Sequence, residues 1–215
     1  MGCPSLAISR HANLGGALEY KWQDVLLRVK KGSKSLKVAL ALPALQSSHK
    51  DYDPAVDLLM SIFTQHDCYF IMQSDYDRGQ LIRYAADRKI IISDSRILSF
   101  DDHVEPWFDF IKTMDFAVSF RIHGAMAAIS NEIPAVVIPT DFRILELVNA
   151  MKLPLLPMEK TKEKKYESLL DIINDVSVDF DEFEKNRRDK LKQYKRILED
   201  VGLEIDPALN AILNQ

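Results

Sequence analysis

Short apolar runs alternate with amphipathic segments along most of the chain, from residue 36 to residue 158. Such runs are long enough for buried strands and too short for helices. The expected strands cover residues 36–42, 68–72, 89–92, 116–120 and 134–139, with a last short one at 153–156. The expected helices cover residues 53–65, 75–87, a segment from Asp101 or Asp102 to 112, a segment around 125–129, and one that starts near Arg143. This regular alternation predicts an α/β fold, a parallel sheet with helices on both faces.

The first part of the chain, residues 1–34, has a different character. More than half of the seven glycines lie there, together with one proline: Gly2, Gly15, Gly16, Gly32 and Pro4. Glycine-rich segments are typical of linkers and ligand loops. One apolar stripe that includes Trp22 predicts a helix over residues 17–31, which packs on the sheet or on a preceding domain. We therefore expect residues 1–34 to form a linker and a helix between domains.

The character changes again after the last expected strand. Residues 159–165 are densely charged, which predicts a solvated segment. Residues 166–176 and 181–198 predict amphipathic helices, because their apolar positions fall on one face among many charged residues. The expected organisation is thus an α/β domain at residues 35–158 and a helical extension at 159–215.

The composition is that of an ordinary globular protein, with 47% hydrophobic and 28% charged residues. The formal net charge of −4 provides no basic field for nucleic acid, so no nucleic-acid partner is expected. No apolar run has the length of a transmembrane segment. Cys3 and Cys68 are the two cysteines and have no CxxC partner, so a zinc knuckle or a disulfide framework finds no support. We expect reduced thiols and a cytoplasmic location.

The sharpest chemical signal is the segment Arg121-Ile122-His123-Gly124, where an expected strand passes into an expected helix. Alternation along the strand end turns residues 121 and 123 to the same side, so their side chains are expected to converge on one ligand. A guanidinium binds carboxylates and phosphates, and an imidazole donates to an anion or transfers a proton. Gly124 indicates a place where a side chain would block a ligand or the sheet. The alternative is a surface arginine, a capping histidine and a glycine needed for packing.

A second junction follows the next strand, at Asp141, Arg143 and Glu146. A purely structural account is available, with Asp141 as the N-cap of a helix and Arg143 with Glu146 as a surface pair one helical turn apart. Both junctions nevertheless follow strands of the same parallel sheet. Ligands bind at that edge of open parallel sheets, which favours a binding role for both junctions.

Other chemistries find little support in the sequence. Residues 51–53 and 75–77 mimic the DxD that some glycosyltransferases use for a metal, but both precede expected helices, so capping explains them better. The remaining histidines have no ligand spacing, and no metal site is expected. Walker A and GxGxxG sequences are absent, so ATPase and dinucleotide-binding functions are not indicated.

Four elements together resemble the polysaccharide pyruvyl transferase family. Residues 2–6 (GCPSL) are similar to the GCPS element in the middle of family members. Residues 115–124 (DFAVSFRIHG) are similar to the family's pattern of D-x-hydrophobic-x-S-x-R-hydrophobic-H-G. Residues 133–137 (IPAVV) and the DFR of residues 141–143 with Glu146 extend the likeness. The resemblance runs from residue 2 to about 150, and the C-terminal helices add little.

The resemblance implies two Rossmann-like halves arranged as in GT-B glycosyltransferases. Family members usually carry a whole domain before the GCPS element, so this chain would be either the C-terminal half of such a protein or a truncated relative. It also implies transfer of pyruvate from phosphoenolpyruvate to a sugar as a ketal, with no further cofactor. Arg121 and His123 match the family's donor-binding arginine and histidine, with His123 as the expected catalytic residue. The expected substrate-binding residues are Arg121, Ser119, Gly124, Asp141, Arg143 and Glu146.

The expected partners follow from that activity. They are phosphoenolpyruvate, a sugar or polysaccharide-precursor acceptor, and either an N-terminal domain or further copies of this chain. Two alternatives stay open. One is a GT-B-like glycosyltransferase domain that binds a nucleotide sugar, with Glu146 as the acid for the ribose. The other is a non-catalytic binding or assembly module that retains the fold.

Overall fold

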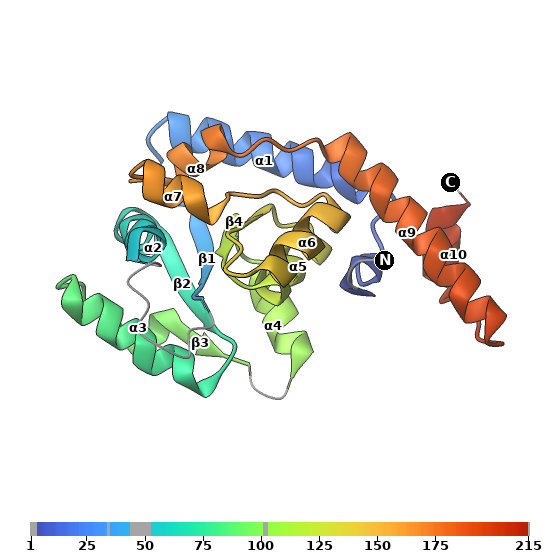
Figure 1. Ribbon diagram of the computed structural model, residues 1–215, viewed down its shortest axis with the longest axis horizontal. Helices are drawn as coiled ribbons and strands as arrows, with labels where there is room; N and C mark the ends of the chain where they lie inside the picture. The colour runs from blue at the N-terminus through green and yellow to red at the C-terminus, as the bar shows by residue number, and fades with distance from the viewer. Residues whose placement is uncertain (1–3, 34, 44–52, 101–102, 215) are drawn as a thin grey trace.

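The computed structural model describes residues 4–33, 35–43, 53–100 and 103–214 (Figure 1). The strands are β1 (Lys37–Ala41), β2 (Asp67–Met72), β3 (Ile97–Ser99), β4 (Phe116–Ser119) and β5 (Ala135–Val137). The longer helices are α1 (Leu14–Lys30), α2 (Asp53–Gln65), α3 (Asp75–Asp87), α4 (Val104–Ile111), α5 (Ile122–Ser130), α6 (Phe142–Met151) and α9 (Phe180–Asp200). Shorter helices are η1 (Pro4–Ala7), η3 (Asp94–Arg96), α7 (Met158–Glu163), α8 (Leu169–Asp175) and α10 (Pro207–Leu213).

The five strands form one parallel sheet in the order β3-β2-β1-β4-β5. Every pairing is parallel, with β1 between β2 and β4. This order is that of a Rossmann-like sheet, in which the chain first builds outward from β1 on one side and then on the other. The expected fold class, an α/β Rossmann-like fold with a parallel sheet, is confirmed.

The two faces of the sheet carry side chains of different size. On one face the Trp22 ring of α1 contacts Phe116 of β4, and Phe63 of α2 contacts Phe70 of β2. On the other face β1 and β4 present small residues, which are listed here: Ala39, Ala41, Ala117 and Ser119. Small side chains let α4 and α5 approach this second face closely, and that approach forms the site described below.

The first helix is part of the same core as the sheet. Besides its ring contact, α1 holds the amino edge of the sheet, because Arg28 donates to both carboxylate oxygens of Asp115 at 2.7 and 3.2 Å. Asp115 in turn accepts the N–H of Lys37 at 2.7 Å. Of the two expected positions for this helix, packing on the sheet is therefore correct. The division into units at residues 1–34, 35–158 and 159–215 stays a prediction.

The last long helix ties the two ends of the described chain together (Figure 1). Arg187 of α9 donates to Glu184 and to the backbone oxygens of Ser9 and His11. The Glu184 carboxylate also accepts the N–H of Gly15 at 3.0 Å. A Cβ at Gly15 would lie 2.4 Å from the backbone oxygen of Phe180, so this glycine serves helix packing.

One expected strand is wrong. Residues 89–92 do not form a strand, and the third strand is instead β3 at Ile97–Ser99. Lys89 has a left-handed backbone (φ 55°), and the N–H of Ile90 bonds back to Ala85 at 2.9 Å, which ends α3. Ile91 is 93% exposed. The apolar run thus forms the end of the turn after α3 and the start of the following loop.

Three further expectations need correction or a limit. Residues 153–156 contribute only an isolated bridge, between Leu155 and Val137, and not a strand. The charged segment 159–165 is exposed as expected apart from Thr161, but α7, which covers Met158–Glu163, and α10 were not expected. The predictions for Gly2, Cys3, residues 51–52 and Asp101 or Asp102 concern positions outside the described residues. Within the described ranges, no helix is long and apolar enough to cross a membrane.

Candidate functional site

The carboxyl ends of β1 and β4 meet at the centre of the sheet. Ala41, the last residue of β1, pairs with Ser119, the last residue of β4. The strand that follows β1 in sequence lies on one side of this pair, and the strand that follows β4 lies on the other. Such a point, where the strand order reverses, opens a crevice at the carboxyl edge of the sheet and is the usual ligand position in this fold.

Ser119 fixes the turn from β4 into α5. Its hydroxyl donates to the backbone oxygen of Arg121 at 2.7 Å and accepts the N–H of the same residue at 3.1 Å. The side chain is buried. Ser119 was expected to bind substrate; its hydroxyl is engaged with the backbone and holds Arg121 in place.

Arg121 ties three parts of this edge together. Its Nε donates to the backbone oxygen of Leu42, just after β1, at 3.2 Å, and Nη2 bonds to a carboxylate oxygen of Asp77. Arg121 is 15% exposed at its side chain and Asp77 is 2% exposed. Among the described residues, Nη1 has no hydrogen-bond partner. The described residues thus hold the guanidinium through Nε and Nη2.

Asp77 is the partner that sequence reasoning missed. Its carboxylate caps α3 by accepting the N–H groups of Gln73 at 2.7 Å and Ser74 at 3.1 Å, and the hydroxyl of Ser74 at 2.7 Å. Capping had been expected for the DxD at residues 75–77, and it is correct for Asp77. The sequence offered no sign that the same carboxylate would also hold Arg121.

His123 lies in a helix and not on a strand. β4 ends at Ser119 and α5 begins at Ile122, so alternation along a strand does not relate residues 121 and 123. That part of the argument for convergence was wrong. Arg121 is the N-cap of α5, and the exposed His123 lies in its first turn. Both residues are nevertheless at the switch point, one anchored within the edge and the other facing solvent.

Gly124 is required by a close approach. A Cβ on this residue would lie 2.6 Å from Oγ of Ser119 and 2.7 Å from Nε2 of Gln73. Contacts that short do not occur, so any side chain would push α5 away from the sheet. The expectation that a side chain at position 124 would block the sheet agrees with this geometry.

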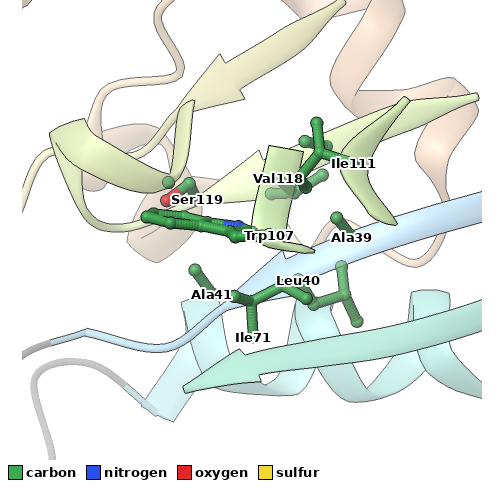
Figure 2. A pocket seen from close by; sticks show the side chains of 10 residues that line it. Ala39, Leu40, Ala41, Ile71, Trp107, Ile111, Val118 and Ser119 are labelled. Carbon is green, nitrogen blue, oxygen red and sulfur yellow. The ribbon is translucent and has the colours of Figure 1, made fainter. Parts of the chain in front are cut away.

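A small hollow lies beside Gly124, above the small residues of β1 and β4. Its lining is mostly apolar and includes the residues of both strands, Ile71 of β2, and Trp107 and Ile111 of α4. The Trp107 ring lies between the side chains of Ser119 and Ala41 (Figure 2). The space open to the centre of a water molecule is about 10 Å³, which is close to what one water needs.

The second junction is more exposed than the first. Asp141 caps α6, as expected, by accepting the N–H of Ile144 at 2.9 Å, and this bond holds the pKa of its carboxyl below the usual value. Arg143 is 87% exposed and pairs with Asp141 at 3.1 Å, not with Glu146 as expected. Glu146 is exposed. Because β5 neighbours β4, these residues follow the strand beside the one that leads to Arg121.

Asp115, the first residue of the motif at residues 115–124, lies far from the switch point. Asp115 lies at the amino edge of the sheet, at the opposite end of β4 from His123, where it bonds Arg28. It serves the fold. Within the described residues, no group of three or more His, Cys, Asp and Glu is placed to hold a metal ion.

Comparison with known proteins identifies no relative. No family model matches the chain, and no curated protein matches it. The family resemblance thus stays a prediction that rests on the motifs.

Proposed function

We propose that the carboxyl edge of the sheet binds phosphoenolpyruvate and that the protein takes part in pyruvyl transfer to a sugar. The observation that carries the proposal is the junction after β4, where Arg121, His123 and Gly124 stand at the switch point of a parallel sheet. Their order matches the motif by which the chain resembles the pyruvyl transferases. The proposed acceptor is a sugar or polysaccharide precursor, and the proposed location is the cytoplasm.

The electrostatics of this edge suit a small anion with two charged ends. Nη1 of Arg121 is available, and the first N–H groups of α5 have no partner within the helix and no side-chain cap. A guanidinium and helix N–H groups together bind carboxylate or phosphate without a metal. The exposed Arg143, which pairs with Asp141, follows the neighbouring strand at the same edge.

The proposed reaction replaces phosphate by two sugar oxygens. The imidazolium of His123 gives a proton to the methylene carbon of phosphoenolpyruvate, which leaves a positive charge on the central carbon. One sugar hydroxyl then attacks that carbon and loses its proton to solvent. A second hydroxyl of the sugar forms the other bond and gives its proton to the phosphate as the bond from carbon to the phosphate oxygen breaks and inorganic phosphate leaves. His123 takes a proton back from solvent. The products are a pyruvate ketal and phosphate.

Calorimetric titration with phosphoenolpyruvate tests the proposal directly. We expect saturable binding by the wild type and loss of most of the affinity in Arg121→Lys, because a lysine cannot keep both the Leu42 and Asp77 contacts and still face a ligand. In the transfer reaction, measured as phosphate release with a sugar acceptor, His123→Ala should abolish turnover while binding persists. Wild-type turnover by His123→Ala would remove the catalytic assignment.

The alternatives are separated by the ligand. Tight binding of a uridine nucleotide without binding of phosphoenolpyruvate would favour a glycosyltransferase domain. No change in melting temperature with either compound would favour a non-catalytic module, since a ligand that binds the folded state must raise it.

A further inference from the structure

Two buried nitrogen donors near the switch point have no acceptor. Nε2 of Gln73 and Nε1 of Trp107 are both shielded from solvent, and neither meets an acceptor among the described residues. Folded proteins rarely leave buried donors unpaired, because such a group has lost its water without gaining a partner. An acceptor that is not part of the described chain is therefore expected beside each.

Both residues lie close to Gly124. Trp107 lines the hollow above β1 and β4, and Gly124 lines it too. Nε2 of Gln73 approaches the same glycine so closely that a Cβ there would lie 2.7 Å away. Figure 2 shows the Trp107 ring over the ends of the two strands, next to Ser119. The Ser119 hydroxyl donates to the backbone oxygen of Arg121 and accepts its N–H, and neither donor has an acceptor among the described residues.

We propose that Gln73 and Trp107 bind a carboxylate oxygen of the ligand in this hollow, so that the enolpyruvyl end of the donor lies under the Trp107 ring. This rests on the proposed function for the identity of the ligand. The hollow has room for about one water-sized atom, and an oxygen that enters replaces the water there. Neither residue belongs to the motifs from which the site was predicted.

The lining decides which end of the ligand enters. Besides Trp107, Ser119 and Gly124, the residues that line the hollow are alanine, leucine, isoleucine and valine. A doubly charged phosphate loses more hydration in such surroundings than a singly charged, planar carboxylate. The phosphate therefore stays outside, toward the start of α5 and Arg121.

The two tryptophans allow a direct test by fluorescence. Trp22 and Trp107 are the protein's only tryptophans, and Trp22 is buried against Phe116. In Trp22→Phe the emission comes from Trp107 alone, and in Trp107→Phe from Trp22 alone. We expect phosphoenolpyruvate, and millimolar pyruvate, to change the emission of the first variant and not of the second. Inorganic phosphate at equal ionic strength should leave both unchanged.

Affinity and stability together separate a ligand contact from a structural role. Trp107→Phe keeps the aromatic ring and removes the N–H, and Gln73→Met keeps the length and removes the amide. Each should weaken phosphoenolpyruvate binding about 10- to 100-fold, the loss of one hydrogen bond to a charged group. The melting temperature of the free protein should stay equal or rise in Gln73→Met, because no hydrogen bond is lost, whereas the smaller ring of Trp107→Phe should lower it through lost packing. Trp22→Phe is the matched control and should bind like the wild type.

Each of the remaining outcomes supports or contradicts either the carboxylate site or the proposed function. If calorimetry detects phosphoenolpyruvate binding but Trp107 emission and both variant affinities are unchanged, the inference is wrong and the proposed function stands. If pyruvate or another carboxylate changes Trp107 emission while phosphoenolpyruvate does not bind, the carboxylate site stands and the proposed function fails. A response to phosphate without a response to pyruvate overturns the carboxylate assignment, and no response to any of these compounds overturns the site.

Discussion

Two arginines in this molecule have different surroundings. Arg187 of α9 is 0% exposed, and it donates to both oxygens of Glu184 and to two backbone oxygens of the N-terminal loop. Burial lowers the pKa of its guanidinium, and Glu184 opposes that change. Arg121 is also held by an acid, Asp77, but it lies at the open edge of the sheet, and its Nη1 has no partner in the described parts of the chain.

The difference separates a structural arginine from a candidate binding arginine. Around Arg187 both terminal nitrogens are directed at acceptors within the protein, and only the buried Nε has none among the described residues, so that region closes the fold. Around Arg121 the described residues provide acceptors for Nε and Nη2, and the unpaired donors of Gln73 and Trp107 belong to residues near the same switch point. Burial alone does not mark a functional residue. The proposed binding role of Arg121 rests instead on hydrogen-bond donors at the carboxyl edge of the sheet that have no acceptor among the described residues.

The largest expected effect is that of a substitution at Arg187, in the region that closes the fold. Arg187→Met should lower the free energy of unfolding by about 3–5 kcal/mol, because it leaves the Glu184 carboxylate buried without its main partner. Urea denaturation measures the change. Arg78→Ala, which breaks the exposed pair with Asp94, is the control and should cost less than about 1 kcal/mol.

This variant also sharpens the comparison of the two regions. At temperatures where Arg187→Met is still folded, it should bind phosphoenolpyruvate as the wild type does. A loss of less than about 1 kcal/mol, or a binding defect in the folded variant, would mean that the closed region is not purely structural.

A smaller loss of stability is expected at the open edge. Arg121→Ala should cost about 2 kcal/mol, and most of that should disappear when Asp77 is already asparagine, because the two side chains share one ion pair. A double-mutant cycle in urea measures the coupling. Arg88→Ala breaks a pair with Asp57 that shares no residue with Arg121 and Asp77, so it is the control and should show no coupling to Arg121→Ala. Additive effects of Arg121→Ala and Asp77→Asn would contradict the pairing.

Glycine substitutions give a matched pair with opposite signs. Gly124→Ala should destabilise by about 1–3 kcal/mol, since its Cβ would press on Ser119 and Gln73. Gly79→Ala in α3 meets nothing within 4 Å and should stabilise by about 0.8–1 kcal/mol, the gain in helix propensity. Thermal unfolding measures both. Equal effects would show that position 124 is not a close approach.

The smallest effects belong to the second junction. Asp141→Ala should cost about 1 kcal/mol through loss of the α6 cap, and Arg143→Ala less than about 0.5 kcal/mol. The pKa of Asp141 is lowered in the folded protein, so its stabilisation is present above the unfolded pKa and is lost as the pH falls through the folded pKa. Urea denaturation should therefore show the difference between wild type and Asp141→Ala shrinking as the pH falls below about 4. A difference independent of pH would contradict the role of the carboxylate.

Much of the fold could be predicted from the sequence because its signals are local. The helices at Asp53–Gln65 and Asp75–Asp87 were predicted with the bounds that the structure has, since capping residues and apolar stripes define them. The third strand was not, because an apolar run at residues 89–92 looks like a strand whether or not a partner strand lies beside it. Whether an apolar run pairs as a strand depends on which strands lie beside it in the folded sheet.

The site was predictable only in part, for a related reason. The motif located Arg121, His123 and Gly124, which are neighbours in sequence. It could not locate Asp77, Gln73 and Trp107, because these residues reach the same edge from other loops and helices. Their side chains carry no local pattern that sets them apart from a helix cap or a core aromatic.

One histidine in each region makes the central claim measurable. His123 faces solvent at the open edge, whereas the backbone of His11 is held by Arg187 and its Nδ1 accepts the N–H of Asn13. Imidazole resonances, assigned with His123→Gln and His11→Gln, can be followed by NMR during titration with phosphoenolpyruvate. We predict a saturable shift of the His123 signals and none for His11. Signals of His123 that stay in place at saturating ligand would contradict the assignment of this edge as the binding site.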